Sequence, residues 1–79
     1  MSGQNVVYEI DGYGVVLSQI QNVYPVEADK CGCPYWGFKY LSGVFEYFNY
    51  KHEPEAKRQR QMFVNALNEY WEKNYVRTK

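Results

Sequence analysis

The sequence predicts an α+β fold: an antiparallel β-meander of four or five strands packed against one long C-terminal helix. Two observations support this prediction. Residues 6–50 contain short apolar and aromatic runs separated by turn-forming residues, which is typical of consecutive antiparallel strands. Residues 55–75 contain neither glycine nor proline and repeat apolar residues at helical spacing. Because 79 residues suit one domain, we expect a single domain over residues 1–79.

The first hairpin is expected over residues 6–17, VVYEIDGYGVVL. Apolar side chains alternate on both sides of Asp11-Gly12, a dipeptide that favours a type I′ turn because both of its residues tolerate positive φ. This turn places Ile10 opposite Tyr13. The hairpin then presents an apolar side to a core.

The next strand is expected from residue 23 to about residue 27, after a turn or bulge over residues 17–22 where the alternation breaks. Pro25 lies inside this strand, which indicates an edge position or a bulge, because proline cannot donate to a ladder. One continuous bent strand over residues 13–27 is the alternative. Residues 28–34, ADKCGCP, are expected to form a loop.

A second, aromatic hairpin is expected over residues 35–50, YWGFKYLSGVFEYFNY. With Ser42-Gly43 as the two central residues of a tight turn, Lys39 faces Glu46. One face of the hairpin then carries an almost wholly aromatic set, namely Trp36, Phe38, Tyr40, Phe45 and Tyr47. The opposite face carries the ion pair and Phe48. We expect the helix to cover the aromatic set and to leave the opposite face uncovered.

The helix is expected to open within residues 52–55 and to run to about residue 75. Pro54 suits a first helical turn, and Glu53 and Glu55 suit the positive end of the helix dipole. The predicted core stripe consists of Ala56, Phe63, Ala66, Leu67 and Tyr70. A second stripe beside it consists of Lys57, Arg60, Val64, Asn68, Trp71 and Tyr75.

One helix cannot cover both faces of so aromatic a sheet, and nine tyrosines favour a surface that is buried by a partner. We therefore expect a non-enzymatic binding module that acts through protein–protein contacts, as a homodimer or with another protein. The residues expected to form its interaction surface are Phe48, Tyr50, Val64, Trp71 and Tyr75.

An alternative function is binding of an anion, a nucleotide or a nucleic acid by the basic cluster Lys57, Arg58 and Arg60, with neighbouring aromatic residues. The net charge of zero counts against general nucleic-acid and membrane binding, which usually need a basic excess. The solvated face of a helix is the simpler interpretation of this cluster.

Cys31 and Cys33 leave several interpretations open: ordinary loop thiols, a redox pair or intermolecular disulfide, a strained local disulfide, or metal ligands with His52. Structural zinc normally takes four ligands, and the sequence offers no second cysteine pair. No nucleophile–base pair or paired carboxylates can be recognised by spacing. We therefore expect no metal, no cofactor and no enzymatic activity.

The first residues, MSGQNVVYEIDGYG, lack the basic segment and apolar core of a signal peptide, and no apolar run is long enough to span a membrane. We expect a cytoplasmic protein without a membrane partner.

The order of elements resembles that of small uncharacterised proteins of bacteria and phages. The resemblance covers residues 8–71 and rests on a hairpin, a further strand, an aromatic hairpin with x-L-x-S-G-x, and a helix that starts with acidic residues and ends in N-x-Y-W. Those proteins share a β-meander capped by a C-terminal helix. The resemblance implies a prokaryotic or phage cytoplasmic protein and transfers no functional residue. One form of the binding module that we expect is a phage or mobile-element modulator of a host protein.

Overall fold

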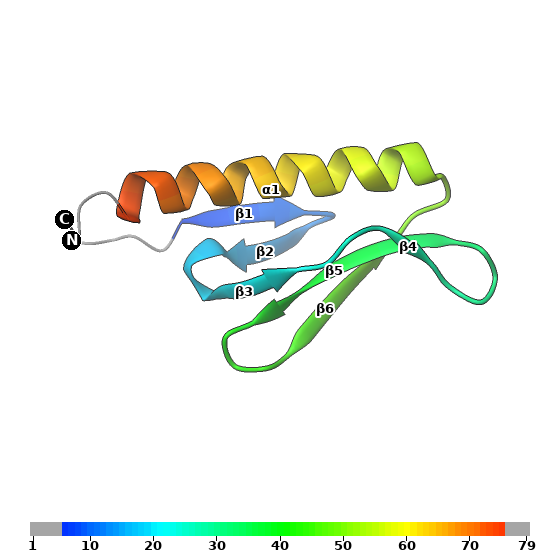
Figure 1. The fold of residues 1–79 in the computed structure, drawn as a ribbon, viewed down its shortest axis with the longest axis horizontal. Coiled ribbons are helices and arrows are strands. Elements are labelled where there is room, and N and C mark those ends of the chain that lie inside the picture. The colour runs from blue at the N-terminus through cyan, green and yellow to red at the C-terminus, as the bar shows by residue number, and fades with distance from the viewer. Residues whose placement is uncertain (1–5, 76–79) are drawn as a thin grey trace.

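A computed structural model describes residues 6–75, with side chains to Lys73. It confirms the α+β fold, a β-meander with one long C-terminal helix (Figure 1). In chain order the elements are β1 (Val7–Ile10), β2 (Tyr13–Val16), a 3₁₀ turn (Leu17–Gln19), β3 (Ile20–Val23), β4 (Glu27–Ala28), β5 (Pro34–Tyr40), β6 (Phe45–Asn49) and α1 (Glu53–Tyr75).

Strand β5 is the centre of the main sheet. Both β3 and β4 pair with one side of β5, and β6 pairs with its other side, all antiparallel. Strands β1 and β2 form a separate hairpin, which lies beneath α1 in Figure 1. The main sheet therefore has β6 at one border and the interrupted pair β3/β4 at the other.

The first hairpin is confirmed. Ile10 pairs with Tyr13, and the two turn residues have positive φ, 50° at Asp11 and 81° at Gly12. These angles are those of a type I′ turn, which matches the twist of the two strands. Ile10 is buried in the core.

The strand predicted over residues 23–27 is wrong in its bounds, because only its first and last residues lie in strands and residues 24–26 do not. β3 ends at Val23 and β4 begins at Glu27, so Pro25 falls in the gap between them on the edge of the sheet. The predicted edge position of Pro25 is confirmed, and its missing N–H costs the ladder no hydrogen bond. The turn or bulge predicted over residues 17–22 is present only in part. The 3₁₀ turn covers Leu17–Gln19, whereas β3 already begins at Ile20 and carries a register shift between Ile20 and Asn22.

The register predicted for the aromatic hairpin is wrong by one residue. Phe38 pairs with Glu46, and Lys39 pairs with Phe45. The predicted Lys39–Glu46 cross-strand pair is therefore absent from this ladder. In its place the Lys39 ammonium lies over the Phe45 ring, 5.6 Å from its centroid, a cation–π contact.

The loop of this hairpin explains the shift. It contains three residues, 41–43, because the Tyr40 N–H donates to the Val44 carbonyl (2.8 Å) and the Gly43 N–H donates to the Tyr40 carbonyl (2.9 Å). Gly43 has a positive φ of 97°, whereas Ser42 does not. A three-residue loop with only its last residue left-handed replaces the expected two-residue turn, in which both central residues would be left-handed.

The shift exchanges the two faces of β6, because side chains alternate along a strand. Phe48 joins Trp36 on the core face and is only 7% exposed. Phe45 and Tyr47, which were predicted for the core face, lie on the other face and are 46% and 51% exposed. On β5 itself, the predicted core residues Trp36 and Phe38 are confirmed as fully buried.

The core is built around three rings. Phe63 of α1 stacks on Phe38 of β5, with ring centroids 5.1 Å apart and planes at 14°, and lies 5.4 Å from the Trp36 ring. All three side chains are fully buried. Tyr8 of β1 meets Phe63 edge to face at 5.5 Å, so α1 holds the first hairpin and the main sheet together.

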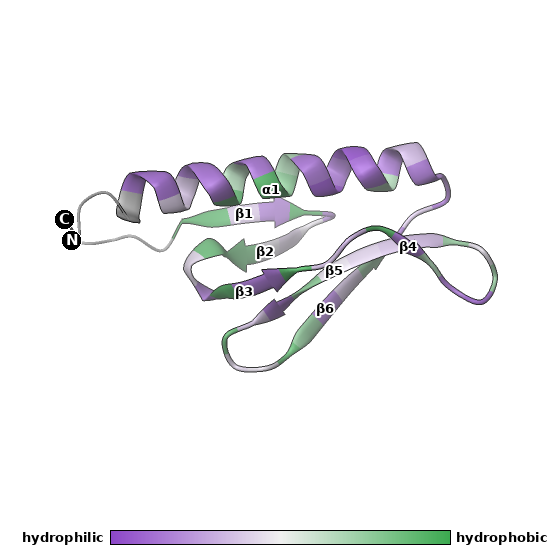
Figure 2. Cartoon of the chain, viewed as in Figure 1, coloured by the Kyte–Doolittle hydropathy of each residue, from purple (hydrophilic) through white to green (hydrophobic). Residues whose placement is uncertain are grey.

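The helix has the predicted bounds, and its first turn carries the acidic residues Glu53 and Glu55. In the predicted core stripe, Ala56 and Tyr70 are buried along with Phe63, and Ala66 and Leu67 pack against the core while partly exposed. Figure 2 shows α1 as largely hydrophilic, with hydrophobic residues concentrated in its middle. Within residues 6–75, no helix combines the length and the apolar character that crossing a membrane requires.

The three-residue loop predicts the outcomes of two neighbouring substitutions. Gly43→Ala should reduce the free energy of unfolding by about 1–2 kcal/mol, because alanine is strained at positive φ. Ser42→Gly should give no stabilisation, because Ser42 does not have positive φ. Urea denaturation of both variants measures the effect. A more stable Ser42→Gly variant would indicate the two-residue turn and would contradict the observed register.

Candidate functional site

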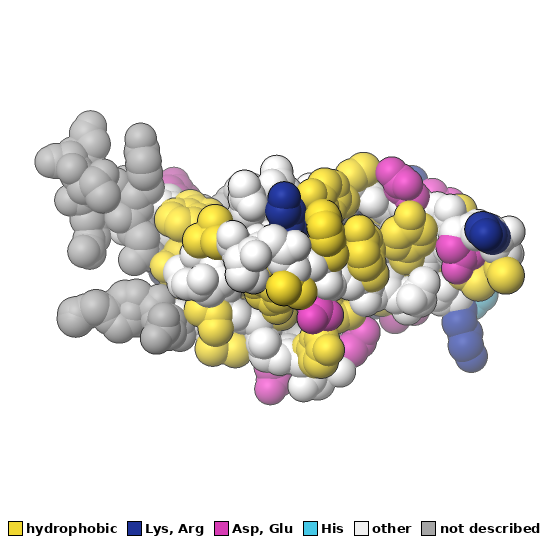
Figure 3. Space-filling model, turned by 90° about the horizontal axis from the view of Figure 1, so that it is seen from below, with side chains coloured by type: hydrophobic (Ala, Val, Ile, Leu, Met, Phe, Trp, Pro, Cys, Tyr) yellow, Lys and Arg dark blue, Asp and Glu magenta, His cyan; other side chains and the backbone are white. Residues whose placement is uncertain are grey.

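The most distinctive surface is an aromatic face on the side of the main sheet that α1 does not cover. We define the aromatic face as the side chains of Tyr24, Tyr35, Phe45 and Tyr47, with Gly37 as its floor. Tyr35 and Gly37 alternate with the buried residues of β5, and Phe45 and Tyr47 lie opposite on β6. Viewed from the side opposite α1, hydrophobic side chains form a row across the molecule (Figure 3).

The four rings of the aromatic face contact one another in sequence. Phe45 and Tyr47 stack with planes at 10° and centroids 6.1 Å apart. Tyr24 lies 5.9 Å from Phe45, and Tyr35 lies 5.7 Å from Tyr47 at 70°. Aromatic pairs in such arrangements contribute about 0.5–1.5 kcal/mol each beyond the area they bury. The rings therefore hold one another in place.

Gly37 allows the Tyr47 ring to lie close to the backbone of β5. A Cβ atom at position 37 would lie 2.5 Å from Tyr47 Cδ1 and closer still to the carbonyl oxygen of Glu46. Gly37 faces Tyr47 directly across the ladder. The tyrosine ring thus covers a strand glycine that has no side chain to pack, a pairing known to support strands.

The rings border a shallow hollow of about 340 Å³, whose lining also includes Pro25 and Glu27. Lys39, over the Phe45 ring, adds a positive charge beside the aromatic face, and Glu27 adds a negative one. Large apolar rings with polar tips, next to one charge of each sign, can contact another protein through apolar burial and side-chain hydrogen bonds.

The predicted interaction surface is not assembled as expected. Phe48 is buried, so its predicted place on the uncovered face is wrong. Tyr50 is half-buried beside the core, where its hydroxyl accepts a hydrogen bond from Trp36 Nε1 (3.2 Å). That hydroxyl is thereby directed to the core side rather than to the uncovered face.

The helix flank is separate from the aromatic face. Val64 is half-buried, and Trp71 is 42% exposed and meets Tyr70 edge to face at 5.1 Å. The side chain of Tyr75 lies outside the described residues. Because α1 packs on the core face of β5, the sheet lies between this flank and the aromatic face.

The basic cluster is partly engaged within the fold. Lys57 pairs with Glu53 at 3.2 Å across one exposed helical turn. Arg60 Nε donates to the carbonyl oxygen of Tyr24 at 2.8 Å and so links α1 to the segment between β3 and β4. Arg58 is exposed. Of the three residues in this cluster, Arg60 has a structural role, which weakens the case for a joint anion site.

The loop with the two cysteines is organised by Asp29. The Asp29 carboxylate accepts hydrogen bonds from the backbone N–H groups of Cys31 and Cys33, both at 2.9 Å, and Gly32 between them has a φ of 83°. Both thiols are exposed and unpaired. Among the described side chains, no three His, Cys, Asp or Glu residues gather as a metal site would require, and His52 therefore does not complete one.

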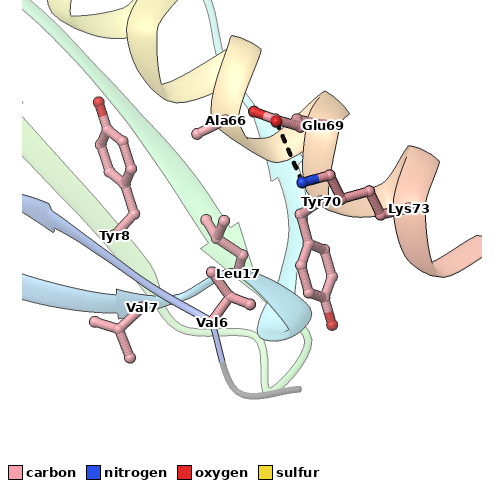
Figure 4. Close-up of a pocket in the computed structure, with 8 residues that line it drawn as sticks. All are labelled: Val6, Val7, Tyr8, Leu17, Ala66, Glu69, Tyr70 and Lys73. Carbon is pink, nitrogen blue, oxygen red and sulfur yellow. Dashed lines mark ion pairs between the residues drawn. The ribbon is translucent and has the colours of Figure 1, made fainter. Parts of the chain in front are cut away.

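A second hollow, of about 250 Å³, lies between β1 and the C-terminal half of α1 (Figure 4). Its walls include Tyr8, Leu17 and Tyr70, which also belong to the core or pack against it. The ion pair between Glu69 and Lys73, 3.4 Å apart, lies on its helix side. We therefore interpret this hollow as the place where the core reaches the surface.

Two tyrosine hydroxyls have a pKa above the usual value for tyrosine. Burial raises the pKa of the Tyr50 hydroxyl above its usual value, while the hydrogen bond from Trp36 acts in the opposite direction. Burial also raises the pKa of Tyr40, and the nearby carboxylate of Glu46 raises it further. Both phenols therefore keep their protons to higher pH in the folded protein than in the unfolded chain.

Sequence reasoning missed the aromatic face because it assigned Phe45 and Tyr47 to the core. One signal could have revealed the correct faces. A single glycine at the end of Leu41-Ser42-Gly43 fits a three-residue loop, whereas a type I′ turn needs two residues that tolerate positive φ, and serine does so poorly.

Comparison with protein-family models, with curated proteins and with solved structures finds no match for this chain.

Adding a methyl group under the Tyr47 ring should destabilise the protein. Gly37→Ala should reduce the free energy of unfolding by about 1–3 kcal/mol, because the new Cβ overlaps a backbone oxygen and a packed ring. Gly14→Ala is the matched control, since its Cβ would meet only a side-chain atom, Val7 Cγ1 at 3.3 Å. Equal losses for the two variants in urea denaturation would contradict the tight packing at Gly37.

The raised pKa values of Tyr40 and Tyr50 predict weaker folding at alkaline pH. The unfolded chain releases these protons from about pH 10 upward while the folded protein retains them, so the free energy of unfolding should fall above that pH. The double variant Tyr40→Phe/Tyr50→Phe should flatten this fall, although losing the Trp36 hydrogen bond costs about 0.5–1.5 kcal/mol at neutral pH. Denaturation at pH 7 and about pH 11 tests this; an unchanged slope would contradict it.

Proposed function

We propose that this protein is a non-enzymatic binding module that contacts a partner protein through the aromatic face. The observation that carries the proposal is the stacked pair Phe45 and Tyr47, each about half exposed on a side of the sheet that the helix leaves open. Tyrosine and phenylalanine supply much contact area at low entropic cost, and exposed clusters of them are enriched at protein interfaces.

A protein partner has more support than a nucleic acid. Surfaces that stack bases combine aromatic rings with a positively charged groove. Here Lys39 is the basic side chain at the rings, while Glu27 lines the same hollow, and Arg60 is bonded to the Tyr24 carbonyl. The net charge of the chain is zero. The anion- or nucleic-acid-binding alternative with Lys57, Arg58 and Arg60 therefore has the weaker support.

The setting we propose follows from the sequence. The protein would act in the cytoplasm of a bacterium, which suits the unpaired thiols of Cys31 and Cys33. The architectural resemblance to small bacterial and phage proteins extends the proposal to modulation of a host protein by direct binding. In the other form of this proposal, two copies of the chain form a homodimer through the aromatic face.

Removing the two exposed rings should weaken binding strongly and leave the fold intact. In affinity capture from a bacterial lysate, the double variant Phe45→Ser/Tyr47→Ser should capture at least about tenfold less of a specific partner than the unaltered protein does, because aromatic anchors dominate interface energies. Val7→Ser/Met62→Ser is the matched control, since both residues are similarly exposed but lie on β1 and α1. Equal capture by both double variants would sink the proposal. Sedimentation at two protein concentrations tests whether the partner is a second copy of the chain.

A further inference from the structure

Strand β6 forms a free border of the main sheet. It pairs with β5 on one side, and within residues 6–75 no strand pairs with its other side (Figure 1). Free strand edges are usually blocked by proline, lysine, bulges or a covering element. The sequence of β6, FEYFN, contains neither proline nor lysine, and its pairing with β5 has no register shift.

The hydrogen bonds of the hairpin show which backbone groups face outward. Tyr40 donates to Val44 and Tyr50 donates to Pro34, so the pairs at the two ends of the ladder are hydrogen-bonded pairs. Hydrogen-bonded and non-hydrogen-bonded pairs alternate along an antiparallel ladder. Residues 45, 47 and 49 therefore occupy the non-hydrogen-bonded positions. Their N–H and C=O groups are directed away from β5, toward the free border.

The two sides of this border differ in chemistry. Phe45 and Tyr47 belong to the aromatic face, while Glu46 points to the opposite side, together with Phe48. A hollow of about 230 Å³ lies between β6 and the first hairpin, lined by Glu46, Tyr47 and Phe48 of β6 and by Asp11 and Tyr13. Two of its lining residues, Asp11 and Glu46, are acidic, and none is basic.

This charge argues against a second copy as the added strand. Symmetric pairing of two β6 strands about Tyr47 would place Glu46 opposite Phe48 of the other copy. The Glu46 side chains of the two copies would then lie about 7–8 Å apart on the diagonal. Asp11 of each copy would add to this negative charge. A strand with basic side chains on that side would instead be attracted.

We infer that β6 binds an extended segment of a partner protein as an added edge strand, with apolar side chains on the aromatic face alternating with lysine or arginine beside Asp11 and Glu46. This inference rests on the proposed function and names the kind of partner. Backbone bonds to residues 45, 47 and 49 supply general affinity, and the two sets of side chains supply specificity, as in other cases of strand addition.

The test is a selection from a displayed library of random nine-residue peptides against the purified protein. Enriched peptides should alternate apolar residues with lysine or arginine. Asn49→Pro should weaken their binding at least about tenfold, because it removes one outward N–H while proline is tolerated on an edge strand. Asn49→Thr is the matched control, since it keeps the N–H, and should bind like the unaltered protein.

A charge variant tests the other half of the inference. Glu46→Lys should weaken binding of the enriched peptides at least about tenfold, Glu46→Gln should weaken it less, and added salt should weaken binding to the unaltered protein. Thermal unfolding of each variant confirms that the fold persists. Two peptides can be N-methylated on the backbone at every second residue, one at the odd and the other at the even positions. Only the peptide whose methylated N–H groups face β6 should lose binding.

The outcomes separate this inference from the proposed function. Peptides that require Phe45 and Tyr47 but tolerate Asn49→Pro overturn the added strand and leave the aromatic face in use. A library that yields no enriched peptide, or peptides without basic residues, also overturns the inference, while the lysate experiment decides the proposed function independently. Sedimentation that shows a dimer abolished by Asn49→Pro makes a second copy the occupant and overturns the basic partner.

Discussion

The packing of Phe63 against Phe38 and Trp36 is the contact on which the rest of the structure depends. It fixes α1 against β5, and the edge contact of Tyr8 with Phe63 brings the first hairpin to the same point. A chain of 79 residues has little other apolar volume to bury, so a few large rings must supply the core. Because α1 occupies the core face of β5, the opposite face of the sheet is left open.

The open face and the free border of β6 follow from the same pairing. The non-hydrogen-bonded positions of β6 carry both the exposed rings and the outward backbone groups, since Phe45 and Tyr47 occupy them. A partner that adds a strand to this border would therefore also meet the aromatic face. Gly37 makes this arrangement compact, because its missing side chain lets the Tyr47 ring lie on the sheet.

Some features of the candidate site were accessible to sequence reasoning and others were not. The excess of aromatic residues over what one helix can cover predicted an uncovered apolar face, and the structure has one. Its members were assigned wrongly: Phe48 is buried, and Phe45 and Tyr47 are exposed. The error came from one loop residue, because a period-two pattern gives the same alternation in either register and only the turn fixes which set faces inward.

The sequence by itself determined the elements whose signals are local. The Asp11-Gly12 turn, the bounds of the helix and its core stripe each depend on neighbouring residues, through positive φ, capping charges and a 3.6-residue period. Only the tertiary structure decided the register of β6 against β5 and the division of the edge strand around Pro25. It also decided the use of Arg60 to hold the Tyr24 carbonyl. These features depend on contacts between residues that are distant in the sequence. The alternating pattern of β6 fits more than one register against β5, and burial of Phe48 beside Trp36 selects the observed one.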